Sequence, residues 1–167
     1  MMKSGNAVGV AACLMALLLA TPSSAAPLDQ RQTAQKSKGF AADKKRQHRV
    51  VLQVNTNEPA TMNLALNNAT NVAQYYKDRG EKVMIEIVTF GPGLNMLRSD
   101  TSPVKARIET LALSTLEISY KACGNTQQNM QKAESKDIPI ISQAQVVPSG
   151  VVRVMELQEQ GWTYVKP

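Results

Sequence analysis

Residues 83–90 read VMIEIVTF and are followed directly by Gly91-Pro92-Gly93. Six of the eight side chains are apolar and most are β-branched, which favours an extended strand. A strand that is apolar on both faces is typical of a parallel sheet covered by helices. Glycine and proline together end such a run. The stretch therefore predicts a central strand of an α/β domain that ends in a tight turn.

The sequence before this strand has the pattern of a first strand and a long helix. Residues 50–54, VVLQV, are apolar and β-branched and lead into a polar loop at 55–57. Pro59 then opens a helical pattern that Gly80 ends. The face of this helix expected in the core consists of Met62, Leu66, Ala69, Ala73 and Tyr76, spaced by three or four residues.

The sequence after the central strand continues the alternation of helix and strand. Ser102 is expected to be an N-cap, with Pro103 at the first helical position. Asn125, with Gln128 three residues later, resembles a capping box for a further helix. The other expected elements are a strand at 116–122, extended pieces at 138–141 and 144–147, a helix after Pro148-Ser149 that Gly161 ends, and a short strand at 162–165.

This alternation predicts a three-layer α/β/α sandwich with a mainly parallel sheet, because right-handed crossovers place helices on both faces. In such sheets ligands bind beyond the carboxyl ends of the strands, near the point where the strand order reverses. Three loops are expected to meet there, at residues 55–57, 91–95 and 123–126. They place Cys123 at the edge where the fold puts its sites.

The composition fits one ordinary domain and excludes several classes of function. The chain has 167 residues, of which 43% are apolar, enough for one buried core. The net charge is +6, but residues 50–167 carry eleven basic and eleven acidic side chains. A nucleic-acid-binding domain is disfavoured, because it needs a concentrated cationic face and aromatic side chains for stacking. With only two cysteines, the chain is not a disulfide scaffold.

The first residues have the form of a secretory signal peptide at 1–25. Lys3 precedes an apolar run at 7–20, which small residues follow. The run is too short to span a bilayer comfortably, and cleavage is expected after Ala25. A lipid anchor at Cys13 is disfavoured, because the apolar run continues past it. The sequence predicts an exported protein, in a compartment such as the bacterial periplasm, with Cys123 as its remaining cysteine and no stable membrane insertion.

Residues 26–49 are expected to form a basic flexible arm, followed by the folded domain at 50–167. The stretch is polar and rich in Lys, Gln and Ala, so it cannot bury enough apolar surface to fold alone. It could attract an anionic membrane or a partner, but a solvated linker is favoured. His48, the only histidine, is interpreted as part of this linker, at the sheet edge opposite the carboxyl ends.

Cys123 is the candidate reactive group. It ends a strand and precedes a helix, so the N–H groups and the dipole of the helix start favour thiolate over thiol. Gly124 permits close approach, and Asn125 and Thr126 offer polar atoms. The alternative is an inert, buried cysteine. The residues leave both interpretations open.

Other kinds of site have weaker support in the sequence. The position of His48 disfavours a Cys-His hydrolase, and no cluster of His, Cys and carboxylate residues suggests a metal. Gly91 and Gly93 could cradle an anion through backbone N–H groups, but the triplet lacks the spacing of a nucleotide-binding loop. Asn55 and Asn95 could bind a ligand, although asparagine is common in turns. No pattern indicates a cofactor.

Several segments, taken in order and spacing, match a known group of proteins. They are residues 51–55, 67–72, 88–93, 122–126 and 148–152, with 160–162. Together they resemble the DsrE/DsrF-like superfamily, and more narrowly the exported branch of DsrE family proteins. The resemblance covers residues 50–167.

The resemblance implies a sheet of about five strands and a small homo-oligomer, often a trimer or a hexamer. In sulfur-relay members, a cysteine after a central strand accepts sulfane sulfur as a persulfide and passes it to a partner cysteine. Cys123 is at the matching position. That role needs an exposed thiolate of low pKa. Relay members work in the cytoplasm, whereas this chain has the form of an exported protein, so their partner carriers do not transfer to it.

Three functions follow from these observations. Cys123 could handle sulfur or thiol redox, as a sulfurtransferase-like carrier with a thiol or sulfur-carrier partner. The chain could instead be a non-enzymatic ligand-binding or assembly module with a structural cysteine. Cys123 could also form an intersubunit disulfide, since unpaired cysteines of secreted proteins often join two chains. The residues expected around Cys123 are Asn55, Gly91, Gly93, Asn95, Gly124, Asn125 and Thr126.

Overall fold

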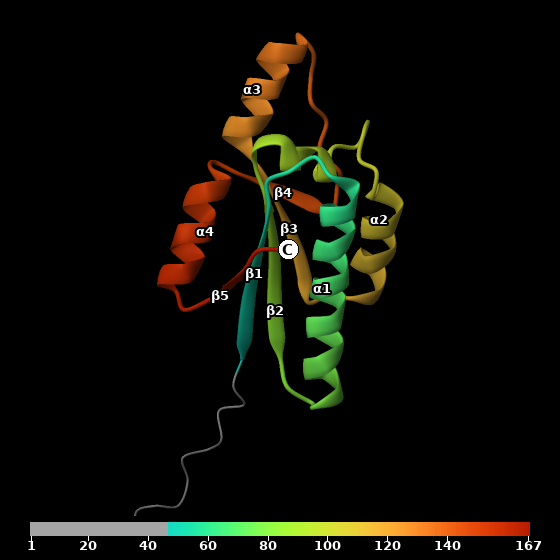
Figure 1. Ribbon diagram of the computed structural model, residues 1–167, viewed down its shortest axis with the longest axis vertical. Coiled ribbons are helices and arrows are strands. Elements are labelled where there is room, and N and C mark those ends of the chain that lie inside the picture. The colour runs from blue at the N-terminus through green and yellow to red at the C-terminus, as the bar shows by residue number, and fades with distance from the viewer. Residues whose placement is uncertain (1–46) are drawn as a thin grey trace, which may run out of the picture. The chain divides into compact units, whose positions relative to one another are not determined.

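The computed structural model describes residues 47–167, which form one five-stranded parallel sheet with helices on both faces (Figure 1). The strands are β1 (His48–Val54), β2 (Val83–Thr89), β3 (Ile118–Cys123), β4 (Ala144–Val147) and β5 (Thr163–Val165), in the order β4-β3-β2-β1-β5. The helices are α1 (Pro59–Asp78), the 3-10 helix η1 (Gly91–Leu97), α2 (Lys105–Ser114), α3 (Gly124–Glu134) and α4 (Gly150–Glu159). The predicted α/β/α sandwich is confirmed.

Two hydrophobic clusters lie on opposite faces of the sheet. The larger joins β1, β2 and β3 to α1, α2 and η1 and includes Leu52, Leu66 and Ile87. The smaller lies under α4 and consists of Val51, Val88, Val154, Leu157 and Trp162. In Figure 1, α1 and α2 lie on one side of the sheet, α4 lies on the other, and α3 projects beyond the carboxyl ends of the strands.

The central strand carries one buried charge. Six of the seven side chains of β2 are buried, as its apolar sequence predicts. Among them, Glu86 is 3% exposed. Its carboxylate accepts two hydrogen bonds from Arg153 of α4, one from Nε at 2.6 Å and one from Nη2 at 3.0 Å. The ion pair connects α4 to the sheet. Because Arg153 pairs with Glu86, the buried carboxylate is not an isolated charge.

The folded part begins earlier than the sequence analysis predicts. His48 and Arg49 belong to β1, so the interpretation of His48 as a linker residue is wrong. The His48 ring stacks on Tyr76 at 3.8 Å between centroids, and its Nε2 lies 2.7 Å from a carboxylate oxygen of Glu81. The expected signal peptide and the arm up to residue 46 lie outside the described residues.

Helix α2 starts later than predicted. Its first residue is Lys105 and its N-cap position is Val104, so Ser102 is not the N-cap. The Ser102 hydroxyl instead donates to the carbonyl of Met96 at 2.6 Å and accepts from the N–H of Val104 at 3.3 Å. The serine thus holds the turn before the helix, where local side-chain hydrogen bonds compete with helix formation.

A buried arginine joins the segment after η1 to the last turn of α3. Arg98 is 3% exposed and donates to both carboxylate oxygens of Asp100, at 2.9 and 2.8 Å, and to those of Glu134, at 2.5 and 3.0 Å. Hydrogen bonding to Arg98 is the main reason why the pKa values of the Asp100 and Glu134 carboxyl groups lie below their usual range.

These lowered pKa values predict a specific acid sensitivity. A carboxyl group with a lowered pKa in the folded state stabilises it above the pKa of the unfolded chain, about 4, and this contribution is lost as the pH falls further. We expect Arg98→Met to lower the free energy of urea unfolding at pH 6, and the difference from the wild type to shrink at pH 3. An equal difference at both pH values would contradict the role of Arg98.

The structure also bears on membrane insertion. Among residues 47–167, no helix has the length and apolar character needed to cross a bilayer.

Candidate functional site

The loops after β1, β2 and β3 meet at one edge of the sheet, as predicted. Parallel pairing of β1 with β2 and of β2 with β3 brings their carboxyl ends together. At the first junction, Gly93 lies directly against the end of β1. A Cβ atom at Gly93 would lie 2.2 Å from the carbonyl oxygen of Val54 and 2.8 Å from Cα of Asn55. The glycine therefore allows η1 to pack on the backbone of the first loop.

Cys123 ends β3 and is itself the N-cap residue of α3. Its Sγ accepts a hydrogen bond from the N–H of Thr126 at 3.4 Å. The prediction that Asn125 caps the helix is wrong, because the helix begins at Gly124. The N–H of Asn125 donates to the carbonyl of Pro148 at 3.2 Å, which ties the helix start to the loop before α4. The sulfur of Cys123 thus accepts a backbone hydrogen bond that a side-chain oxygen accepts at most helix N-caps.

A second helix start reaches the same sulfur. Gly150 is the first residue of α4, and its backbone N–H contributes to lowering the pKa of the Cys123 thiol. The approach is close: a Cβ atom at Gly150 would lie 2.9 Å from a ring carbon of Phe90 and 3.2 Å from Cβ of Cys123. Glycine at this position thus allows α4 to begin directly beside the thiol.

The surroundings of Cys123 favour its ionised form. Burial raises the pKa of the thiol, but hydrogen bonds from the Thr126 side chain and from the N–H groups of Gly150, Thr126 and Asn125 lower it. The donors prevail, and the pKa lies below its ordinary value. Donors from two helix starts stabilise negative charge on the sulfur, as at other anion sites of this kind.

Thr126 connects the thiol to the loop after β2. Its Oγ1 accepts a hydrogen bond from the N–H of Gly91 at 3.0 Å. Because that contact uses the oxygen as an acceptor, the hydroxyl proton is free to donate to the sulfur. Gly91 has φ +53°, in the left-handed region that favours glycine, and this conformation is part of the turn that presents its N–H to Thr126.

This contact predicts opposite results for two substitutions of Thr126. Thr126→Val removes the hydroxyl, so we expect the pKa of Cys123 to rise and iodoacetamide alkylation of the folded protein to slow about fivefold near neutral pH. Thr126→Ser keeps the hydroxyl and is expected to match the wild type. Rates measured across a pH series separate ionisation from access. Identical profiles for the two variants would rule out the hydroxyl as a donor.

Not every predicted residue approaches the sulfur. Gly124 follows Cys123 directly and packs against β4, since its Cβ would lie 3.2 Å from the Val147 carbonyl oxygen. Asn55 is half-buried in the first loop, where its carbonyl oxygen would lie 4.0 Å from a Cβ at Gly91. Asn95 is half-buried in η1, where its carbonyl accepts from the N–H of Arg98 at 3.4 Å. No hydrogen bond joins either asparagine side chain to Cys123 among the residues described.

The site lies away from the point where the strand order reverses. From β1 to β4, each successive strand is added on the same side of the sheet, whereas β5 is added on the other side of β1, so the strand order reverses between β1 and β5. Cys123 ends β3, two strands from β1. The expectation that the site lies at the reversal is therefore wrong. Instead, the β4–α4 loop and the start of α3 form it together.

The loop between β4 and α4 is a fourth segment of the site that the sequence does not indicate. Its Pro148 carbonyl accepts from the N–H of Asn125, and its Gly150 lies against Cys123 and against Phe90, which follows β2. Pro148-Ser149-Gly150 has the composition of a helix start, which gives no indication of what the helix start faces. The pairing of Cys123 with Val147 in neighbouring strands brings this loop beside the thiol.

Access to the sulfur agrees with the interpretation of Cys123 as a buried cysteine and differs from the exposed thiolate that the resemblance implies. Cys123 is 3% exposed, so the thiol is buried rather than exposed. Within the described part of the chain, no three His, Cys, Asp or Glu side chains are grouped so that they could hold a metal ion. The site therefore holds a covered thiol whose pKa is lowered.

Comparison with known proteins supports the fold. No family model and no curated protein matches the chain. A similar solved structure is that of a protein of unknown function, MTH1491, from Methanobacterium thermoautotrophicum, with 28% sequence identity and a TM-score of 0.60. The match covers 72% of this chain and 99% of that one. The chain thus shares the α/β/α architecture of an archaeal protein whose own activity is unknown.

Proposed function

We propose that the chain is an exported DsrE-like protein that handles sulfur, with Cys123 accepting sulfane sulfur as a persulfide. The observation that carries the proposal is the position of Sγ at the start of α3. Sγ accepts a hydrogen bond from the N–H of Thr126 at 3.4 Å, and Gly150, the first residue of α4, lies against the same cysteine. A helix start beside a cysteine favours the thiolate, which is the form that attacks a sulfane sulfur.

The proposed reaction needs no added oxidant. The Cys123 thiolate attacks a sulfane sulfur of an inorganic polysulfide, one S–S bond forms, and one S–S bond within the polysulfide breaks. The shortened polysulfide leaves with the electron pair, and the protein keeps a persulfide. An acceptor thiolate then attacks the terminal sulfur and returns the Cys123 thiolate. The same donors stabilise the thiolate as leaving group in the second step.

The proposed partners are further copies of the chain, as a trimer or a hexamer, and a thiol or sulfur-carrier protein. Beside the resemblance to DsrE family proteins, exposed apolar side chains on α4 support a contact surface. Val151, Val152 and Met155 are 52%, 47% and 55% exposed on the helix that begins at the thiol. Such clustered apolar side chains are typical of interaction surfaces. Export to a periplasm-like compartment remains a prediction from the signal sequence.

One observation favours the alternative of a structural cysteine in a binding or assembly module. Cys123 is 3% exposed, and its Cβ and the ring of Phe90 both pack closely against Gly150. Small thiols in such contacts often serve packing alone. The two functions differ in whether sulfur reaches the folded protein's thiol.

Sulfur transfer from the loaded protein tests the proposal. Reduced protein is treated with inorganic polysulfide, freed of excess reagent, and mixed with cyanide, which removes sulfane sulfur as thiocyanate. We expect about one thiocyanate per chain from the wild type and none from Cys123→Ser. A matched control is Ser119→Ala, on the same strand but away from the thiol. Equal thiocyanate from Cys123→Ser would overturn the proposal.

A further inference from the structure

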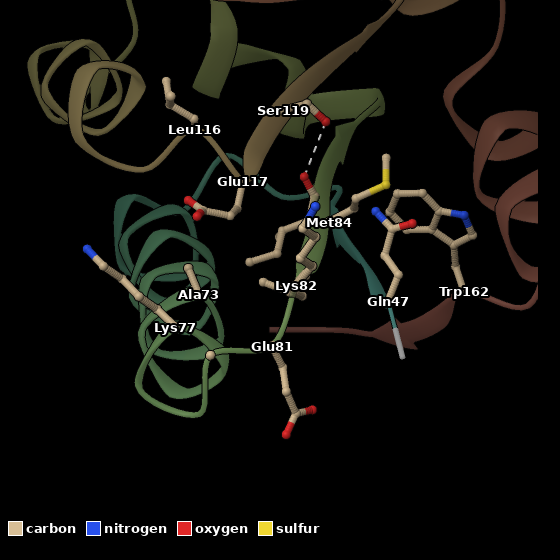
Figure 2. A pocket seen from close by; sticks show the side chains of 13 residues that line it. Gln47, Ala73, Lys77, Glu81, Lys82, Met84, Leu116, Glu117, Ser119 and Trp162 are labelled. Carbon is tan, nitrogen blue, oxygen red and sulfur yellow. Dashed lines mark hydrogen bonds between the residues drawn. The ribbon is translucent and has the colours of Figure 1, made fainter. Parts of the chain in front are cut away.

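A hollow of about 590 Å³ lies at the sheet edge opposite Cys123. It is bounded by the end of α1, the start of β2, the segment before β3, and Trp162 (Figure 2). Helix α4 packs on Glu86 and Val88 but does not cover Met84, the next residue of β2 on that face. Met84 is 43% exposed, whereas the other side chains of β2 are buried.

The walls of the hollow are mainly apolar. Met84 and Trp162 contribute to one part of it, and Ala73 and Leu116 to another (Figure 2). Leu116 is 84% exposed, an unusual state for a leucine beside a core. The volume lies in the range of pockets that enclose most of a small organic molecule. Apolar surface of this extent gains free energy when a ligand removes it from water.

The charges around the hollow balance. Glu81 is already bound by His48 and Arg79, and Figure 2 shows its carboxylate pointing out of the hollow. Lys77, Lys82 and Glu117 also line it, and none of these three side chains forms a hydrogen bond or ion pair with another of residues 47–167. Counting Glu81, the lining residues include two lysines and two glutamates. This balance disfavours a ligand of either net charge and suits a neutral one with a polar end.

We propose that this hollow binds a neutral, mainly apolar small molecule with one polar end, independently of Cys123. Its apolar body lies against Met84 and Trp162, and its polar end reaches Lys82 or Glu117. The site is separate from the thiol because the two lie at opposite ends of β2 and β3. Binding there adds a function that sulfur chemistry at Cys123 does not require.

Fluorescence of Trp162 can test this proposal, because it is the only tryptophan of the chain. The probe is 1-N-phenylnaphthylamine, a neutral apolar amine, titrated into the full chain. We expect saturable quenching of Trp162 emission with one probe per chain. Met84→Asp places a carboxylate on the apolar wall and is expected to weaken binding about tenfold or more. Its partly exposed position allows the variant to fold, which a thermal melt verifies.

Matched variants separate this site from other apolar surfaces. Met155→Asp, on exposed α4, is expected to leave the probe's affinity within about twofold, and Cys123→Ser to leave it unchanged. Leu116→Asp, at a largely exposed residue of the same hollow, is a second variant expected to weaken binding. The anionic probe 8-anilinonaphthalene-1-sulfonate is expected to bind less tightly than the neutral one. Unchanged binding in Met84→Asp and Leu116→Asp, loss of binding in Met155→Asp, or tighter binding of the anion would each overturn the proposal.

Discussion

Gly93→Ala is expected to destabilise the domain by about 3 kcal/mol or more. The added Cβ would lie 2.2 Å from the carbonyl oxygen and 2.6 Å from the carbonyl carbon of Val54. Both atoms belong to the backbone at the end of a buried strand, so no side chain can rotate away. Either η1 or the end of β1 must shift, which opens the junction on which the site is built. Urea unfolding followed by far-UV circular dichroism measures the loss.

Gly161→Ala is the matched control for this prediction. Nothing lies within 4 Å of a Cβ atom at Gly161, but its φ of +82° is in the left-handed region. The expected loss is therefore the conformational cost alone, about 1 to 2 kcal/mol. If Gly93→Ala loses no more stability than Gly161→Ala, the close packing of η1 on β1 is not what requires glycine.

Arg153→Met is expected to cost about 3 to 5 kcal/mol of folding free energy, because it leaves the Glu86 carboxylate buried without its cation. The Glu86 side chain is 4% exposed, and both its oxygens are bound by Arg153. Methionine keeps much of the apolar stem of the arginine, so the loss reports the charge rather than packing. The measurement is again urea unfolding at neutral pH.

Two further variants distinguish the buried pair from its surface neighbour. Glu156 lies 3.9 Å from Arg153 and is 52% exposed, so Glu156→Gln is expected to change stability by about 0.5 kcal/mol or less. The double variant Glu86→Leu with Arg153→Met removes both charges and is expected to recover most of the stability. A single Arg153→Met variant as stable as the wild type would show that Glu86 tolerates isolation.

The fold could be predicted because its signals are local. The apolar run of β2, the spacing of Met62 and Leu66 in α1, and the glycines after helices each report on their own segment. Boundaries were less accurate where a side chain has an uncommon role. Cys123 caps α3, whereas the sequence rule assigns caps to oxygen-bearing side chains and therefore predicts a cap two residues later, at Asn125.

The site could be predicted only in part, because its decisive contacts are distant along the chain. Cys123 and Thr126 lie close in sequence, and a helix start after a strand was visible. Gly150 approaches the thiol from a loop 27 residues further on, and Gly91 reaches it through Thr126. Single-segment patterns contain no information on such contacts. For the same reason, the sequence leaves open whether the thiol is exposed or buried.

The central claim is that Cys123 accepts sulfane sulfur in the folded protein. The most direct measurement is the intact mass of the protein purified from its native compartment without reductant, before and after brief exposure to polysulfide, beside Cys123→Ser. We expect the wild type alone to gain mass in steps of about one sulfur atom, removable by reductant. A wild-type mass that never changes, together with a thiol that resists alkylation until the protein unfolds, would contradict the account and assign Cys123 a structural role.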